Sequence, residues 1–273
     1  MTPEEEYCFD VRGYLVVEKA VAPDYLAQLN ERLVFWEEKA RKELADKPEK
    51  KEKRGPNIGF FNLLNEEPSM LELVANPAIL PYVDVLVQSP ILEQFGANFR
   101  WQGAQSTIHG GHTPYQPVNF YHVAQGRIYN NHLRVMYAMH DIGPGEGSLR
   151  VVPGSHKANF PWPGAGRLPE VGEALQELFV ELPLKAGSAL VFTHDILHAS
   201  YSENEGMRRV LHLAYNFGGF TRTWLADETD YERLYEEAPE GSWLQYLLRP
   251  PAYQDAIPKP ALPRGIAADL SSR

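Results

Sequence analysis

The residues of this 273-residue chain that are best suited to chemistry are a histidine and an arginine close together near its end, His198 and Arg209. An imidazole can hold a transition metal, and a guanidinium can hold a carboxylate through a planar pair of hydrogen bonds. The polar segment 202–206 between them predicts a turn that joins two strands, so that His198 faces Arg209 on the next strand. Such a pair suits an iron site that also binds a keto acid.

Composition narrows the class of protein around this pair. The net charge of -10 argues against a nucleic-acid partner, because phosphate binding needs clustered basic residues. No apolar run reaches the length of about 18 residues that a membrane span needs, and the first residues are acidic, unlike a signal peptide. The single cysteine, Cys8, excludes an internal disulfide and a thiolate metal cage. We therefore expect a cytoplasmic globular protein that has neither membrane nor nucleic-acid partners.

The pattern along the chain predicts one domain, 1–273, that is mainly β with some α. A strand is expected over 9–21, and a helix from Pro23, as part of an N-terminal helical layer over about 20–95. A C-terminal extension over about 218–273 carries aromatic residues, among them Trp224. Many short strands with turn signals between them indicate a double-stranded β-helix, or jelly roll, over about 99–217. Its strands are expected at 99–109, 132–142, 148–153, 179–184, 188–198 and 208–217.

The hairpin MYAMHDIGPGEGSLRVVPGSHK lies upstream of His198. Together with FDVRGYLVV near the start, it resembles the phytanoyl-CoA dioxygenase family of nonhaem iron, 2-oxoglutarate-dependent oxygenases. The family pattern of an acidic turn, a glycine and Pro-Gly-Ser-His is matched by Asp141, Gly147 and the segment 153–156. The resemblance runs from about residue 9 to 217, and it implies the jelly-roll fold.

The resemblance also implies roles for residues near the second strand pair. His198 takes the position of the distal iron ligand, and Arg209 takes that of the residue that binds the far carboxylate of 2-oxoglutarate. Ser200 matches a position whose hydroxyl helps to hold that carboxylate. Arg208 competes with Arg209 for its role. Because alternation along a strand sends neighbours to opposite faces, only one of the two arginines can point inward.

The first family ligand pair, His-x-Asp, is matched best by His109-Gly110-Gly111, which makes His109 the second expected iron ligand. Gly111 stands where the carboxylate belongs. Iron-dependent aliphatic halogenases have this His-x-Gly or His-x-Ala pattern, with chloride in the position of the carboxylate. The alternatives are a hydroxylase that manages without the carboxylate, or a tight glycine turn that needs a positive φ. His122-Val123-Ala124 is a rival match, which we set aside because His122 lies in a predicted loop.

Further residues are candidates for the substrate or anion side of the site. Gly111, His112, Asn131 and His156 form this group, although a buried structural role fits His156 better. His194 is also close enough in sequence to His198 to reach the site. The long connection 110–131, which contains Tyr115, predicts a lid over the substrate.

The expected function is an Fe(II)- and 2-oxoglutarate-dependent oxygenase that uses O2 to hydroxylate or otherwise oxidise an unactivated C–H bond of a small organic molecule. The first alternative is an aliphatic halogenase that holds chloride beside Gly111. The second alternative is a jelly roll that binds a ligand without redox chemistry. Halide dependence distinguishes the two enzymes, and oxygen-dependent succinate formation distinguishes both from a binding protein.

Overall fold

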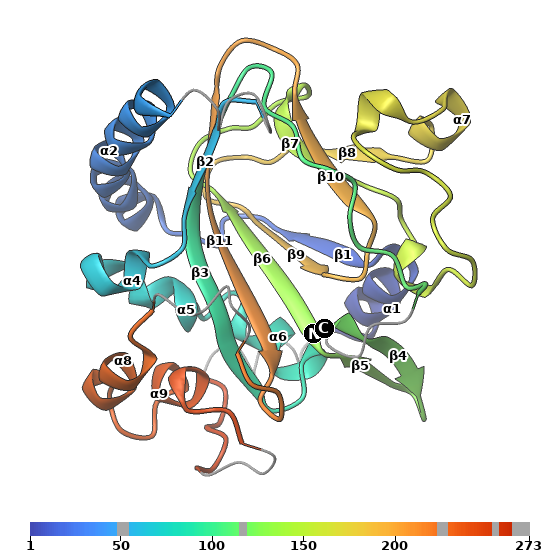
Figure 1. Cartoon of the computed structure of the whole chain (residues 1–273). Helices are drawn as coiled ribbons and strands as arrows, with labels where there is room; N and C mark the ends of the chain where they lie inside the picture. The colour runs from blue at the N-terminus through green and yellow to red at the C-terminus, as the bar shows by residue number, and fades with distance from the viewer. Residues whose placement is uncertain (48–54, 115–118, 223–228, 253–256, 264–273) are drawn as a thin grey trace.

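The computed structural model describes residues 1–47, 55–114, 119–222, 229–252 and 257–263. Two antiparallel sheets face each other in it, and helices cover the outer face of the larger sheet (Figure 1). The facing sheets confirm the predicted jelly roll with its helical layer. Tyr115 and Trp224 lie outside the described residues. In the described part of the chain, no helix combines the length and apolarity that crossing a membrane requires.

The larger sheet has six strands in the order β1-β9-β6-β11-β3-β2, and each strand is antiparallel to its neighbours. Its strands are Tyr14–Val17 (β1), Asn57–Phe60 (β2), Pro90–Trp101 (β3), His132–Ala138 (β6), Ala189–Thr193 (β9) and Met207–Phe217 (β11). β3 begins earlier than expected, because the apolar run after Pro90 continues as a strand. The central strands β6 and β11 provide the floor of the site described below.

The smaller sheet has three strands in the order β10-β7-β8. They are Glu146–Val151 (β7), Val180–Leu182 (β8) and His198–Ser202 (β10). The predicted hairpin of β10 and β11 is wrong, because β10 pairs with β7 while β11 pairs with β3 and β6. The turn after Ser202 therefore carries the chain from one sheet to the other. A separate two-stranded ribbon consists of Tyr121–Ala124 (β4) and Arg127–Asn130 (β5).

The first helix corrects the prediction of a strand over 9–21, because α1 (Pro3–Arg12) precedes the short strand β1. Thr2 and Glu5 form a capping box at its start, and Gly13 ends it in a left-handed conformation with φ of 82°. α2 (Pro23–Asp46) is longer than its apolar positions suggested. The remaining α-helices are Leu63–Glu66 (α4), Leu71–Val74 (α5), Leu80–Leu86 (α6), Glu173–Gln176 (α7), Tyr231–Glu237 (α8) and Trp243–Leu248 (α9).

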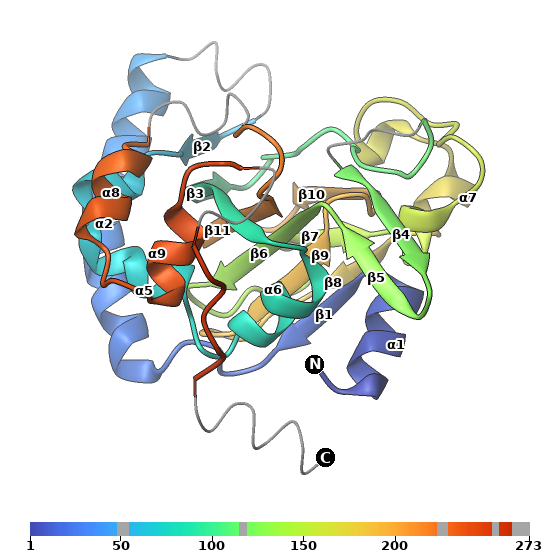
Figure 2. The same cartoon turned by 90° about the horizontal axis from the view of Figure 1, so that it is seen from below.

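The hydrophobic core has two parts, one on each side of the larger sheet. The first packs α2, α5, α6 and α9 against the outer face of the sheet, and it includes Trp36, Leu211, Leu213 and Tyr215. Figure 2 shows these helices gathered on one side of the strands. The second lies between the sheets and includes Leu149, Phe192 and Val210. Alternate residues of β11 thus belong to different layers, as the side-chain period of a strand requires.

Candidate functional site

His109 and His198 lie beside each other where the smaller sheet meets the loop that follows β3. Their ring centroids are 3.9 Å apart. The two backbones form an isolated antiparallel bridge, in which His109 N–H donates to the His198 carbonyl at 3.1 Å and His198 N–H to the His109 carbonyl at 2.9 Å. The structure therefore brings together the two histidines that the sequence singled out as iron ligands.

The same nitrogen is engaged in both rings. Nδ1 of His109 lies 2.8 Å from the carbonyl oxygen of Thr107, and Nδ1 of His198 lies 2.7 Å from that of Ile196. Since a carbonyl oxygen only accepts, each Nδ1 carries the proton and each Nε2 keeps a lone pair. Burial, and then the neighbouring His109, lower the pKa of His198 well below its usual value. His198 is therefore neutral, which is the state of a metal-binding imidazole.

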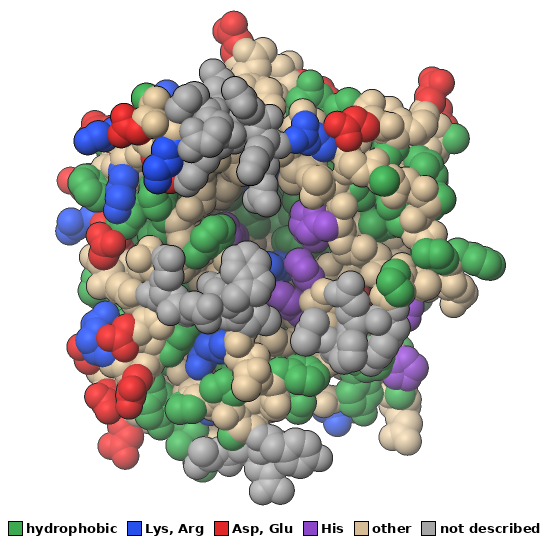
Figure 3. Space-filling view, viewed as in Figure 1, with side chains coloured by type: hydrophobic (Ala, Val, Ile, Leu, Met, Phe, Trp, Pro, Cys, Tyr) green, Lys and Arg blue, Asp and Glu red, His purple; other side chains and the backbone are tan. Residues whose placement is uncertain are grey.

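The pair opens onto a cavity of about 270 Å³ between the two sheets. Histidine side chains gather at the hollow in the face that Figure 3 shows. The described lining combines apolar side chains with polar and basic ones, and it contains no aspartate or glutamate. The lining residues are Asn57, Phe61, Gln94, Asn98, Arg100, Ser106, His109, Arg134, Val135, Met136, Leu149, Phe192, His194, His198, Ser200, Arg208, Val210 and His212.

Arg208 points into this cavity and is 4% exposed. Its Nη1 donates to the Gly147 carbonyl at 2.8 Å and its Nη2 to Asn98 Oδ1 at 2.8 Å, while Nε has no hydrogen-bond partner among the described residues. Burial, and then the positive charge of Arg100, lower the pKa of Arg208 well below its usual value. A buried guanidinium whose partners are neutral favours an anion in the cavity.

Ser200 lines the same end of the cavity as Arg100 and Arg208. It is 3% exposed, and its hydroxyl accepts a hydrogen bond from Nη1 of Arg100. Arg100 and Arg208 are direct neighbours across β3 and β11. Ser200 and His198 have the same parity on β10, so both face the cavity, as the spacing predicted.

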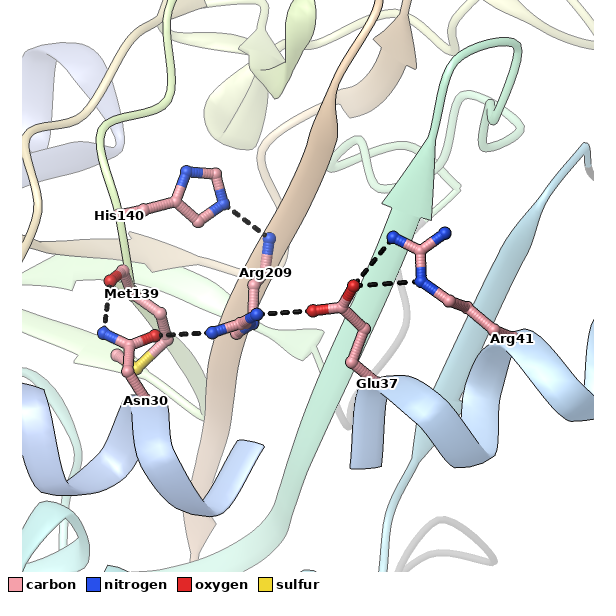
Figure 4. Close-up of polar contacts among 6 residues, drawn as sticks. All are labelled: Asn30, Glu37, Arg41, Met139, His140 and Arg209. Atoms are coloured by element: carbon pink, nitrogen blue, oxygen red, sulfur yellow. Dashed lines mark hydrogen bonds and ion pairs between the residues drawn. The ribbon is translucent and has the colours of Figure 1, made fainter. Parts of the chain in front are cut away.

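Arg209 lies on the other face of the larger sheet, which corrects its expected place in the site. Figure 4 shows its guanidinium between Asn30 and Glu37 of α2. It donates to Asn30 Oδ1 at 2.8 Å and forms an ion pair with Glu37. The physical reason is alternation, because Leu211 and Leu213 pack into the helical core and residue 209 shares their face. Arg208, which we had considered as the competitor, occupies the inner position.

Gly111 has φ of 95° and Gly110 has φ of 89°, as a glycine turn requires. A Cβ at Gly110 would lie 2.2 Å from the carbonyl oxygen of Ile196. At Gly111 the nearest atoms would be those of the Leu197 side chain, at 3.4 Å and beyond. A Cβ at 111 would therefore touch Leu197 at ordinary contact distance, whereas the positive φ makes any side chain there unfavourable.

The remaining substrate-side candidates are not among the described residues that line the cavity. His112 lies against Asp195, with Nδ1 3.7 Å from Oδ2, and burial raises the pKa of Asp195 to about 7. Asn131 uses its backbone, whose N–H donates to Phe120 and whose carbonyl accepts from Phe217. His156 is fully buried, and its Nε2 donates to the Asp10 carbonyl at 2.9 Å, which fits the structural role considered for it.

The sequence did not indicate Gln94, Arg100, Arg134 or His212, although all four line the cavity. They occupy alternate positions on β3, β6 and β11 and so share the inner face. His194 also lines the cavity, and its ring centroid is 5.6 Å from that of His198. The rival His122 lies exposed on β4, not in a loop, and does not belong to the described lining.

The donor set fits a transition metal in part. Two imidazoles whose orientation is fixed through Nδ1–H groups are suitable iron ligands. Within the described ranges, no group of three or more histidine, cysteine, aspartate or glutamate side chains is arranged to hold a metal. The protein therefore offers two ligands here, and small molecules would complete the coordination.

This combination of facing antiparallel sheets, a histidine pair and a basic cavity defines a jelly-roll protein with a candidate metal site. The family model for phytanoyl-CoA dioxygenase (PhyH) matches residues 9–210. The chain thus belongs to the phytanoyl-CoA dioxygenase family and is a 2-oxoglutarate-dependent oxygenase. No curated protein sequence matches it.

Solved structures share the fold. HygX from Streptomyces hygroscopicus, with nickel and 2-oxoglutarate bound, has a TM-score of 0.67 and 19% identity over 81% of this chain and 89% of HygX. EctD from S. alaskensis has a TM-score of 0.55 and 21% identity over 82% of this chain and 79% of EctD. The epimerase SnoN, in complex with Fe3+, alpha ketoglutarate and nogalamycin RO, has a TM-score of 0.53 and 16% identity over 80% and 84% of the two chains.

Proposed function

We propose that this protein uses Fe(II), 2-oxoglutarate and O2 to oxidise an unactivated C–H bond of a small organic substrate, with hydroxylation as the outcome. The observation that carries the proposal is the His109–His198 pair, whose rings lie side by side at a basic cavity and are each oriented by a carbonyl oxygen at Nδ1. Membership of the phytanoyl-CoA dioxygenase family supports the same chemistry. HygX, which has the same fold, was solved with iron and with nickel and 2-oxoglutarate.

His109 and His198 would hold the iron through Nε2. The carbonyls of Thr107 and Ile196 accept from the Nδ1–H groups, which fixes the tautomer and the orientation of each ring. The reciprocal backbone hydrogen bonds between the two residues keep the rings together. Iron with bound 2-oxoglutarate supplies the activation of O2 and the oxidising power for the C–H bond.

Arg208 would bind the far carboxylate of 2-oxoglutarate. Its buried charge has only the neutral oxygens of Gly147 and Asn98 as hydrogen-bond partners in the described chain. A carboxylate would supply the missing counter-charge, and hydrogen bonds between charged groups are worth about 1.5–3 kcal/mol each. The Ser200 hydroxyl lies at the same end of the cavity. It accepts a hydrogen bond from Arg100, and its own proton can be donated to the same carboxylate.

Halogenation is the second candidate, because Gly111 stands where the carboxylate of the motif belongs. The halogenase alternative needs an anion position beside the histidine pair at the place of that carboxylate. Halide dependence of the product distinguishes it from hydroxylation.

The test is oxygen-dependent conversion of 2-oxoglutarate to succinate by the iron-loaded protein. We expect succinate with iron and O2, none without either, and none from His198→Ala. The amount should not change when chloride replaces sulfate in the buffer. A wild-type protein that binds neither iron nor 2-oxoglutarate would contradict the proposal and favour a binding protein.

A further inference from the structure

The cavity is basic in an acidic protein. The chain carries a net charge of -10, yet three arginines and no carboxylate stand among the described residues that line the cavity. Two of them, Arg100 and Arg208, are cross-strand neighbours at one end. The third, Arg134, comes from β6 and lies elsewhere in the cavity. Since one far carboxylate accounts for the first end, Arg134 needs an explanation of its own.

The sheet register fixes where Arg134 lies. Ala214 of β11 pairs with Arg134 on one side and with Gln94 of β3 on the other, so the three share one row across the sheet. Because the side chain of Ala214 is small, the guanidinium crosses it, and Nη1 donates to Gln94 Oε1 at 2.7 Å. This row is six residues along β11 from Arg208, a separation of about 20 Å between the backbone positions.

Arg134 also contacts the ring that lies beside the metal-binding pair. Its Nε donates to Nδ1 of His194 at 3.3 Å. A neutral His194 that accepts at Nδ1 carries its proton on Nε2, so this ring offers a second donor instead of a ligand. The ring centroid of His194 lies 5.6 Å from that of His198 and 6.2 Å from that of His109. Arg134 and His194 thus place hydrogen-bond donors within reach of the metal site.

Most of the donor capacity of Arg134 remains available. A guanidinium has five N–H groups, and the contacts with His194 and Gln94 use two of them. Among the described residues, the buried Glu93 acts on Arg134 electrostatically. Although burial lowers the pKa of Arg134 to about 10, the group stays protonated at neutral pH. It is a charged donor that faces the cavity without a contacting counter-ion among the described residues.

The wall near this row is mostly apolar, with His212 beside it. Phe192 of β9 pairs with Arg134, and Met136 follows it on the same face of β6. Phe61 borders the cavity and packs its ring edge-on against His212, with centroids 5.6 Å apart. A ligand held here would therefore meet one cationic end and apolar sides.

We infer that Arg134, supported by Gln94 and His194, binds an anionic group of the primary substrate, so that the substrate is an organic acid with an apolar body. The inference rests on the proposed function, in which Arg208 is occupied by 2-oxoglutarate and the metal by the histidine pair. Arg134 would hold the carboxylate of the substrate while the apolar wall places a neighbouring C–H bond toward His109 and His198. Charge-assisted bonds of this kind select an acid over its neutral analogue.

The test compares acids with their neutral amides. The protein is loaded with zinc in place of iron and saturated with 2-oxoglutarate, which prevents turnover. Ligand-observed NMR then gives the Kd of acetate, butyrate and phenylacetate, each against its primary amide. We expect each acid to bind about 10-fold more tightly than its amide or better, and phenylacetate to bind most tightly of the three because of the apolar wall.

The variants assign the preference to Arg134. Arg134→Met should abolish the preference for the acid. Gln94→Glu keeps the arginine but gives it a carboxylate partner, so it should abolish the preference as well, even if Arg134→Met fails to fold. Arg208→Met is the matched control and should keep the preference. Equal binding of acid and amide by the wild type, including no detectable binding of either, would overturn the inference, as would a preference that survives both Arg134→Met and Gln94→Glu.

The Kd of 2-oxoglutarate is measured separately for Arg134→Met. We expect Arg134→Met to leave the Kd of 2-oxoglutarate within about threefold of the wild type, since Arg208 holds its far carboxylate. A larger loss together with an unchanged acid preference would assign Arg134 to the co-substrate and overturn the inference. If instead the proposed function is wrong, the wild-type protein makes no succinate. In that case the comparison of acids and amides is made in the double variant Arg100→Met/Arg208→Met, where Arg134 is the remaining arginine among the described residues that line the cavity.

Discussion

The imidazoles of His109 and His198 lie side by side because their backbones exchange two hydrogen bonds, not because the side chains attract each other. This exchange ties the loop after β3 to the first residue of β10. A carbonyl accepts from Nδ1 in each case, so both rings present the same nitrogen. The backbone bonds do not involve the rings, so the loss of either ring is a test of the site that need not disturb the fold.

Replacing either histidine with alanine should remove metal binding while the protein stays folded. A two-ligand site that loses one imidazole loses half of its protein donors, and we expect the Kd for iron(II) to rise about 100-fold or more. His122→Ala is the matched control, because His122 lies exposed on β4, outside the described lining of the cavity. Calorimetry under anaerobic conditions measures the affinity, and circular dichroism checks the fold. Wild-type affinity in both single variants would exclude the pair as the metal site.

Arg208→Ala should raise the Kd of 2-oxoglutarate about 10-fold or more, because it removes the buried cation that faces the cavity. Arg209→Ala should leave that Kd nearly unchanged. It should instead lower the free energy of unfolding by about 1 kcal/mol, since it breaks the contacts with Glu37 and Asn30 that join β11 to α2. The two neighbouring variants act as controls for each other in titrations with 2-oxoglutarate. The opposite order of the two affinities would return the role to Arg209.

Glycine substitutions in the loop after His109 should cost stability in a graded way. Gly111→Ala meets the side chain of Leu197 at ordinary contact distance, so its cost is that of a positive φ, about 1–2 kcal/mol. Gly110→Ala should cost more, because its Cβ would also collide with the Ile196 carbonyl. Gly111→Asp should not tighten iron, since the positive φ at this position is unfavourable for a side chain and its Cβ would pack against Leu197. Urea unfolding gives the order of stability, and tighter iron binding by Gly111→Asp would show that its side chain does reach the metal.

The stability of the protein should fall between pH 6.5 and 4, in part through His156. Burial lowers its pKa from 6.5 to about 4 in the folded state. Below pH 6.5 the unfolded chain binds a proton at this ring that the folded protein does not, so stability is full above that pH and is lost as the pH falls toward 4. The loss should be about 2 kcal/mol at pH 5.

His156→Gln keeps a donor for the Asp10 carbonyl but cannot titrate, so its unfolding free energy should fall less steeply with pH in this window. His122→Gln, at an exposed position, should behave as the wild type does. Urea unfolding at several pH values measures the slopes. An identical slope in His156→Gln and the wild type would show that His156 takes up no proton on unfolding in this range.

The sequence supported the fold and the histidine pair because their signals are local. The turn-separated β-branched runs predicted the strands, and the family resemblance assigned Ser200, which lines the cavity with His198. The wrong prediction of a strand over residues 9–12 could have been avoided from local sequence. Thr2, Pro3 and Glu5 form the pattern of a capped helix start, but the β-branched residues after Gly13 favoured a strand.

The other errors depend on which strands become neighbours. Alternation allowed either Arg208 or Arg209 to face inward, and the helical layer that covers Leu211 and Leu213 decided between them. Large apolar residues at every second position after Arg209 were the available signal. Arg134 had no comparable signal, because its place beside Gln94 exists only once β6 and β3 both pair with β11 around Ala214.

An anomalous-scattering map at the iron edge, from crystals grown without oxygen in iron(II) and 2-oxoglutarate, tests the iron site most directly. We expect one strong peak within bonding distance of Nε2 of both His109 and His198, with the far carboxylate of 2-oxoglutarate on Arg208. An iron peak away from that pair, or a far carboxylate on any residue other than Arg208, would contradict it.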